Sequence, residues 1–316
     1  MVKAMNKGRV IGTYTGEERG PLLICLAGIH GNEPAGVHAL EILFHLLDIE
    51  PQSNPDFVFK GRVIGILGNL AAREKRERFL QKDLNRIWTT AMVNKVRSQR
   101  PDNLRGEERE LRELIDLIEQ EIVDYEPEQL VILDLHTTSA EGGIFSVATD
   151  DPESIRIAVE LHAPVIKGML KGIKGSTLHY FTTQRLGIPT VGVAFEAGQH
   201  DDPLSVNRCL AAVINCLRTL GCVQAEQVEN RYDQLLQEYS KGLPKVAELV
   251  FHHPIKPGDQ FAMVPDFQNF QPVHEGQILA ADRRGEIRSP LDARILMPHY
   301  QKRGDDGFFL IREIDF

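Results

Sequence analysis

Four short, almost purely apolar runs separated by longer helical patterns constrain the fold of this chain more than any other feature. The runs cover residues 22–26, 63–67, 130–135 and 190–195. Strands that are covered by helices on both faces are apolar throughout, whereas half-exposed strands alternate with polar residues. The four runs therefore predict a largely parallel sheet that is buried between helices.

Helical periodicity between these runs supports the same fold class. Apolar residues at helical spacing predict helices over residues 34–47, 107–123, 154–162 and 203–220. Two of these segments begin with a proline, which favours the first turn of a helix. Strands that alternate with helices in this way indicate an α/β domain with a mixed, largely parallel sheet.

The chain changes character after Gly221. Residues 226–244 are polar and helix-like, and residues 245–316 are short apolar segments interrupted by prolines and glycines, a pattern typical of β hairpins. At 316 residues the chain also exceeds what one hydrophobic core usually supports. We therefore expect a large α/β domain over residues 1–225, a helical linker over residues 226–244 and a small β-rich C-terminal domain over residues 245–316.

The charge of the chain limits its partners. The formal net charge is −9, so the field of the protein repels phosphate and argues against binding to nucleic acid or to an anionic membrane. The longest apolar runs are about half of the roughly 18 residues that a membrane span needs. We expect a small-molecule partner whose carboxylate is held by local cations. A homo-oligomer is compatible with the sequence, which does not fix the oligomeric state.

The cysteines and the N-terminal segment indicate the cellular compartment of the protein. Cys25, Cys209, Cys216 and Cys222 form no C-x-x-C pair, and we expect free thiols of a reducing environment. Basic residues within positions 1–20 are not followed by an apolar stretch, so this segment does not read as a secretory signal. The sequence predicts a cytoplasmic protein.

Polar residues cluster where three of the apolar runs end. His30 and Glu33 follow the first run, His136 ends the third, and Glu196 ends the fourth. The carboxyl ends of parallel strands lie at one edge of a sheet, and ligands bind there where the strand order reverses. We therefore expect these side chains to converge although they are far apart in the sequence.

Two imidazoles and one carboxylate are the ligand set of a catalytic zinc ion whose fourth position is open to water. We predict that His30, Glu33 and His136 bind such an ion, and that Glu196 is the general base that takes the proton of water. Asp134 points to the same side of its strand as His136, and it is expected to orient a ligand imidazole, with His30 as the suggested partner.

A fourth segment, at residues 78–86, is dense in hydrogen-bond donors. Arg78 is a candidate to stabilise the oxyanion that forms when water adds to a carbonyl. Asn85 and Arg86 are candidates to bind a substrate carboxylate, because a guanidinium donates two parallel bonds to it. Asp83 is a further candidate to orient a ligand. The neighbouring Arg73 and Arg76 are interpreted as solvated surface charges.

With these pieces in place, the chain resembles the aspartoacylase and succinylglutamate desuccinylase family, which is related to the zinc carboxypeptidases. The matching pieces, in the same order and spacing, are G-I-H-G-N-E-P-A-G at 28–36, R-F-L-Q-K-D-L-N-R at 78–86, D-L-H-T-T-S at 134–139 and F-E-A-G at 195–198. The resemblance covers residues 20–220, and the β-rich tail is similar to the tail domain of the family.

The resemblance implies a zinc-carboxypeptidase-like fold with one zinc ion per chain. It implies hydrolysis of the amide bond of an N-acyl amino acid, with the zinc bound by His30, Glu33 and His136. By the same resemblance Arg78 polarises the carbonyl, Asn85 and Arg86 hold the substrate carboxylate, and Glu196 is the base.

One departure from the family concerns the choice of substrate. Aspartoacylases carry a tyrosine followed four residues later by an arginine that binds the side-chain carboxylate of the substrate. Here Gln184 stands four residues after Tyr180, and Arg185 comes one place later. If Arg185 takes over, acidic N-acyl amino acids are expected; if Gln184 faces the pocket, neutral or amide side chains are expected, and the register favours the second outcome.

Two other functions use the same residues. A zinc carboxypeptidase would apply the metal, Glu196 and Arg86 to a peptide. A non-catalytic relative would bind metal without turnover, and Glu196 argues against it because binding alone does not need a base. In a purely structural interpretation, Glu33 would only interact with the dipole of the following helix, and Glu196 would be a solvated loop carboxylate.

Overall fold

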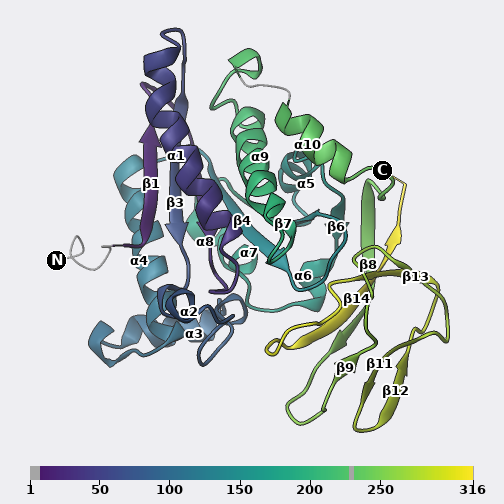
Figure 1. The fold of residues 1–316 in the computed structure, drawn as a ribbon. Coiled ribbons are helices and arrows are strands. Elements are labelled where there is room, and N and C mark those ends of the chain that lie inside the picture. The colour runs from purple at the N-terminus through teal and green to yellow at the C-terminus, as the bar shows by residue number, and fades with distance from the viewer. Residues whose placement is uncertain (1–7, 228–230, 316) are drawn as a thin grey trace.

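The computed structural model describes residues 8–227 and 231–315, through which an 11-stranded sheet runs (Figure 1). Residues 1–7, which hold Lys3 and Lys7, and residues 228–230 of the expected linker lie outside the described part. The strand order is β1-β3-β2-β4-β7-β5-β6-β8-β14-β13-β10. The strands are β1 (Val10–Thr15), β2 (Glu18–Ala27), β3 (Lys60–Leu67), β4 (Leu130–Thr138), β5 (Phe145–Ala148), β6 (Val165–Lys167), β7 (Thr190–Gln199), β8 (Val246–Pro254), β10 (Pro272–Val273), β13 (Ala293–Leu296) and β14 (Asp306–Glu313).

The centre of the sheet is parallel and fully buried, as the apolar runs predict. β2 pairs in parallel with β3 and β4, and β4 pairs in parallel with β7. Successive residues of β2 enter two different cores: Leu22, Ile24 and Leu26 belong to one, and Leu23, Cys25 and Ala27 to the other. A strand covered on both faces has no polar face to present, so the prediction of a buried α/β sheet is confirmed.

Helices form the two outer layers (Figure 1). One core packs the sheet against α1 (Ala35–Ser53), α5 (Pro152–Glu160), α9 (Leu204–Thr219) and α10 (Arg231–Tyr239). The other core packs it against α3 (Thr90–Ser98) and α4 (Glu107–Tyr125). The remaining helices are α2 (Leu70–Lys75), α6 (Met169–Gly172), α7 (Thr177–Tyr180), α8 (Thr183–Leu186) and the 3-10 turns η2 (Leu84–Arg86), η3 (Pro101–Asn103) and η4 (Ala225–Gln227).

The four helices expected from periodicity are present, with different ends. α1 continues to Ser53, past the expected end at residue 47. Its last buried residue is Leu47, and the final turn runs free of the core. A pattern of buried residues cannot report a turn that buries nothing, which explains the difference.

The C-terminal strands extend the large sheet. β8 pairs in parallel with β6 and antiparallel with β14, which in turn pairs with β13. A second sheet joins β9 (Ala262–Met263), β11 (Ile278–Asp282) and β12 (Gly285–Arg288). The expected β hairpins are therefore present. The division at residues 225 and 245 stays a prediction, because the sheet is continuous across it.

Two further features concern the expected environment of the chain. Cys25, Cys209, Cys216 and Cys222 are free and buried, as expected. Within the described residues, no helix is long and apolar enough to cross a membrane.

A buried ion cluster fixes the edge of the sheet to the helical layer. Arg9 is 1% exposed, and its guanidinium donates to the carbonyl oxygen of Leu67 at 3.0 Å and to the carboxylate of Glu113 at 2.8 Å. It also pairs with Glu110, which accepts bonds from the backbone N–H groups of Leu70 and Ala71 at the start of α2. Arg9 therefore links the end of β3, the start of α2 and α4.

We predict that Arg9→Met lowers the free energy of unfolding by about 3–5 kcal/mol, because it takes the buried cation away from two buried carboxylates, of which Glu113 keeps only the exposed Arg109. Denaturant unfolding of the purified variant measures the change. The control is Arg109→Ala, since Arg109 also pairs with Glu113 but its side chain is 57% exposed. We expect a loss of about 1 kcal/mol or less for that exposed pair. Equal losses in the two variants would contradict the assignment of Arg9 as a structural cation.

Candidate metal centre and active site

The polar residues that follow the apolar strands meet at one edge of the sheet. The chain passes from β2 to β3 on one side and then to β4 on the other side of β2, so the strand order reverses there. His30 and Glu33 lie in the loop after β2, while His136 and Glu196 are paired neighbours in β4 and β7. Ligand sites of open parallel sheets form at such a reversal. The convergence expected from the sequence is confirmed.

Glu33 joins the two imidazoles. Its carboxylate oxygens lie 2.7 Å from Nδ1 of His30 and 3.0 Å from Nδ1 of His136, and the second oxygen also accepts the backbone N–H of Thr137 at 3.1 Å. All three side chains are buried, and one ligand atom from each lies within 4.8 Å of the others. Burial favours the neutral acid, but the charge and hydrogen bonds of the two histidines hold the pKa of Glu33 well below its ordinary value.

The outer nitrogen of each imidazole meets another carboxylate. Nε2 of His30 lies 3.2 Å from Asp83, and Nε2 of His136 lies 3.1 Å from Asp134. This corrects the expected pairing of Asp134 with His30: Asp134 contacts the histidine two residues along its own strand. A carboxylate behind each imidazole fixes the orientation of the ring.

These contacts make the cluster suited to a divalent metal ion. Both Nδ1 atoms face the ionised carboxylate of Glu33. A second carboxylate contacts Nε2 of each ring and so fixes its orientation. Neutral imidazoles and a carboxylate are the donors that a catalytic zinc site uses.

The loop that carries Asp83 is held by one buried carboxylate that the sequence analysis missed. Glu107, at the start of α4, is 1% exposed and accepts the backbone N–H groups of Gln81 and Lys82 at 3.0 and 3.1 Å, as well as that of Leu80. Burial alone would raise the pKa of Glu107, but these backbone bonds lower it. The charged sequence around residue 107 resembles an ordinary helix surface, so no local signal distinguishes it.

Asp83 organises the residues on both sides of it. One oxygen accepts the backbone N–H of Asn85 at 2.8 Å and so caps η2, as aspartate does at helix starts. The other oxygen accepts hydrogen bonds from Nε and Nη2 of Arg78 at 3.2 and 3.0 Å. Burial opposes ionisation, but Arg78 and His30 hold the pKa of Asp83 well below its ordinary value. Nη1 of Arg78 then lies 3.7 Å from Glu33, beside the two imidazoles.

Glu196 faces the same cluster without a partner. It is 8% exposed, and its Oε2 makes no hydrogen bond. Burial raises the pKa of Glu196 to about 8. A buried carboxyl group that lies beside His30, Glu33 and His136 and has a pKa of about 8 can take up and release a proton.

Asn85 and Arg86 lie in the same pocket, but Arg86 already has a counter-ion. The side-chain amide of Asn85 lies 3.3 Å from Nε2 of His136, and its carbonyl oxygen accepts the backbone N–H of Thr177 at 3.1 Å. The guanidinium of Arg86 donates to the backbone oxygen of Asn85 at 2.7 Å and pairs with Asp306 of β14. Asp306 also accepts from His252 at 2.8 Å.

Thr177 and Asp306 were missed by the sequence analysis. Thr177 donates its hydroxyl to Asp134 at 2.6 Å and so supports the carboxylate behind His136. Asp306 lies at the end of the polar segment 298–306, which could have been recognised as a break between two apolar strands. No feature of the sequence shows which of its residues faces Arg86.

The three residues at the departure from the family pattern do not line this pocket. Tyr180 is 1% exposed and packs in the core against Trp88. Gln184 is exposed on α8, and Arg185 lies over the ring of Tyr180 at 4.3 Å and donates to Thr90. None of the three is among the residues around His30, Glu33 and His136.

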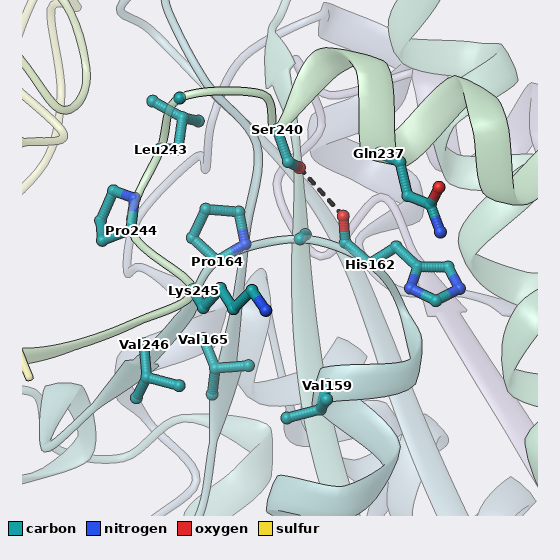
Figure 2. A pocket seen from close by; sticks show the side chains of 12 residues that line it. Val159, His162, Pro164, Val165, Gln237, Ser240, Leu243, Pro244, Lys245 and Val246 are labelled. Carbon is teal, nitrogen blue, oxygen red and sulfur yellow. Dashed lines mark hydrogen bonds between the residues drawn. The ribbon is translucent and has the colours of Figure 1, made fainter. Parts of the chain in front are cut away.

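A second, more spacious cavity lies elsewhere. Its volume is about 490 Å³, and α5, β6, α10 and the start of β8 line it (Figure 2). Its His162 contacts Asp233 at 3.3 Å, and the hydroxyl of Ser240 donates to the backbone oxygen of His162 at 2.9 Å. Its lining contains no group of converging ionisable side chains, so it is a weaker candidate for a catalytic site than the cluster of His30, Glu33 and His136.

Comparisons with known proteins point to one family. A model of the succinylglutamate desuccinylase/aspartoacylase catalytic domain matches residues 19–220. The succinylglutamate desuccinylase of Pseudomonas putida is 41% identical over 66 residues, which are 21% of this chain and 18% of that protein. That of Photorhabdus laumondii is 38% identical over 78 residues, 25% of this chain and 22% of that protein. The matches thus span about a fifth of the length of these curated relatives.

Solved structures show the same fold over nearly the whole chain. A succinylglutamate desuccinylase/aspartoacylase from Rhodobacter sphaeroides has a TM-score of 0.66 and 16% identity, and the match covers 96% of this chain and 88% of that one. The product-bound ectoine utilization protein EutE (DoeB) from Ruegeria pomeroyi has a TM-score of 0.62 and 17% identity, with 95% and 87% covered. The expected zinc-carboxypeptidase-like α/β fold is confirmed.

The pair of Arg86 and Asp306 predicts a pH-dependent contribution to stability. Burial opposes ionisation of Asp306, but His252 and Arg86 lower its pKa from 3.8 to about 2. A group whose pKa is lower in the folded state stabilises the fold above its unfolded pKa, and this stabilisation is lost as the pH falls toward the folded pKa. Asp306→Asn should therefore lower the free energy of unfolding by roughly 2 kcal/mol at pH 7. This destabilisation should become smaller as the pH is lowered from 5 to 2.

Unfolding in denaturant at several pH values measures this difference. The control is Asp150→Asn, because Asp150 pairs with Lys171 at 3.3 Å but both side chains are at least 70% exposed. We expect no measurable pH-dependent change in the control. A difference for Asp306→Asn that stays constant from pH 7 to pH 2 would show that its carboxylate is not stabilised in the folded state.

Proposed function

The chain belongs to the succinylglutamate desuccinylase/aspartoacylase family, and from this we propose that it is a zinc-dependent deacylase acting on the amide bond of an N-acyl amino acid. The observation that carries the proposal is the position of Glu196, a buried carboxyl group with an unpartnered oxygen beside the His30, Glu33 and His136 cluster. A protein that only binds metal does not need this second carboxyl group.

His30, Glu33 and His136 would hold one zinc ion per chain through Nδ1, the carboxylate and Nδ1. When bound, zinc supplies a Lewis acid that polarises the scissile carbonyl and lowers the pKa of water. Asp83 and Asp134 keep both imidazoles turned toward it, since each contacts the outer nitrogen of one ring.

Glu196 moves the proton of the reaction. In its ionised form it accepts a proton from water as the oxygen of that water bonds to the acyl carbon. It then donates this proton to the amide nitrogen as the carbon–nitrogen bond breaks. The products are a carboxylate from the acyl group and an amino acid with a free amine. The placement of Glu196 directly across from His136 in the neighbouring strand supports this role.

Arg78 and Asn85 act on the substrate. Arg78 keeps Nη1 near the cluster while Asp83 binds its other nitrogens, so the guanidinium is oriented before substrate arrives. In this position it donates to the oxyanion that develops on the acyl oxygen. Asn85 and Arg86 bind the α-carboxylate, which Arg86 can share with Asp306 because a guanidinium has five donors.

The family supports a deacylase over a zinc carboxypeptidase, because the model that matches residues 19–220 describes succinylglutamate desuccinylases and aspartoacylases. A peptidase with the same ligands would release amino acids from peptides. Release of free amino acid from N-acyl amino acids, with none from dipeptides and tripeptides, would support the deacylase and exclude the peptidase.

Two wider predictions stay proposals. Buried free cysteines support a reducing compartment, for which we propose the cytoplasm. The negative net charge supports a small-molecule substrate over nucleic acid.

We predict that the purified protein contains one zinc ion per chain and that His30→Ala and His136→Ala each lose it. Each substitution removes one of the three proposed ligands. Elemental analysis after dialysis measures the metal content. The control is His38→Ala. The side chain of His38 lies on α1, is 52% exposed and pairs with Glu41, and His38 is not one of the three proposed ligands. Full zinc content in both ligand variants would overturn the assignment.

We predict that Glu196→Gln keeps its zinc and its affinity for substrate but loses at least ~10²-fold in kcat, because the amide cannot carry the proton. Steady-state kinetics together with zinc analysis separate the two effects. The matched control is Glu160→Gln, an exposed glutamate on α5, which should leave kcat unchanged. Turnover near that of the unmodified protein would remove Glu196 from the mechanism.

A further inference from the structure

One wall of the metal-site cavity is apolar. Val147 of β5, Met169 and Leu170 of α6, and Ile173 just after it line the cavity together with Ala194 and Met297. These six residues belong to, or pack against, a third hydrophobic cluster under β8 and β14. Leu170, Ile173, Ala194 and Met297 are only partly buried, so their methyl and methylene groups face the cavity.

The opposite wall has no free cation. Among the described residues that line this cavity, Arg78 and Arg86 are the only lysine or arginine side chains. Arg78 is paired with Asp83 and Arg86 with Asp306. A substrate carboxylate can share Arg86, but a second carboxylate would meet no uncompensated cation.

The charges around the cavity make a second anion still less favourable. Five carboxylates surround it or pair with its arginines: Glu33, Asp83, Asp134, Glu196 and Asp306. When all five are ionised, their negative charges exceed by one the four positive charges of the two guanidiniums and one divalent ion. A carboxylate placed against the apolar wall would lose its water without gaining a partner, which strongly disfavours binding.

We propose that this cavity selects N-acyl amino acids with a small, uncharged aliphatic side chain, which packs against Met169, Ile173 and Met297 while the single α-carboxylate lies near Asn85 and Arg86. The inference rests on the proposed deacylase function and gives its substrate class. It does not depend on Gln184 or Arg185, neither of which reaches the cavity.

Binding to the zinc-loaded Glu196→Gln protein tests the selectivity without relying on turnover. Calorimetric titration with N-acetyl-leucine and N-acetyl-aspartate should give a Kd at least ~10-fold lower for N-acetyl-leucine, as expected for an unpaired charge in an apolar site. Equal affinities, tighter binding of N-acetyl-aspartate, or no binding of either compound would overturn the proposal.

A cation placed in the wall should change the preference. Ile173→Arg, in the same Glu196→Gln background, should reduce or reverse the ratio of the two affinities, and Leu170→Arg serves the same purpose if Ile173→Arg does not fold. The matched control is Leu204→Arg, because Leu204 is 48% exposed on α9 and does not line the cavity. An unchanged ratio in a folded wall variant would also overturn the proposal.

Assays of amino acid release by the unmodified protein test the proposed deacylase function separately. Release of amino acid from N-acetyl-aspartate but not from N-acetyl-leucine would overturn the aliphatic selectivity and leave the deacylase intact. Preferential binding of N-acetyl-leucine with no release from any N-acyl amino acid would overturn the deacylase and leave the selectivity of the cavity intact.

Discussion

The carboxylate of Glu33, shared between the inner nitrogens of His30 and His136, is the contact on which the rest of the site depends. It joins the loop after β2 to the end of β4, and it is kept ionised although it is buried. The charges around it follow from that position. A buried anion needs partners, and the two imidazoles in turn need carboxylates behind them, which Asp83 and Asp134 provide. Glu33, the two imidazoles and the carboxylates behind them therefore form a continuous set of paired charges, beside which Glu196 is left without a partner for its Oε2.

The loop between β3 and α4 connects these paired charges to the rest of the fold. Glu107 binds the backbone of residues 80–82, and Asp83 then orders both Arg78 and η2. Glu110 and Glu113, one and two turns further along α4, bind Arg9 at the edge of the sheet. One helix thus carries the carboxylates that hold the active-site loop and those that hold the sheet edge. A metal site on loops needs this kind of support to keep its geometry.

The sequence predicted the centre of the molecule better than its margins. Residues 22–26 are apolar throughout and residues 130–135 are apolar except for Asp134, which identifies buried parallel strands. His30 and His136 follow these runs within four residues, so their meeting was predictable from topology. Asp134 was assigned to His30 because a strand pattern gives the side of a residue but not its neighbour across a loop. Tyr180 and Gln184 were placed by register with a family pattern, and register does not show that Tyr180 packs against Trp88. Asp306 could not be predicted, because its contact with Arg86 joins residues 220 positions apart.

That separation has a consequence for how the molecule is made. β8 joins the large sheet through β6, and β14 joins it through β8, so the position of Asp306 beside Arg86 depends on both pairings. During synthesis, the proposed metal ligands and Glu196 leave the ribosome before β14, and until then Arg86 lacks Asp306. Contacts between distant parts of a chain form slowly because the loop must first close. The charge balance of the pocket, and any selectivity that this balance confers, therefore depends on a contact of high sequence separation between η2 and β14.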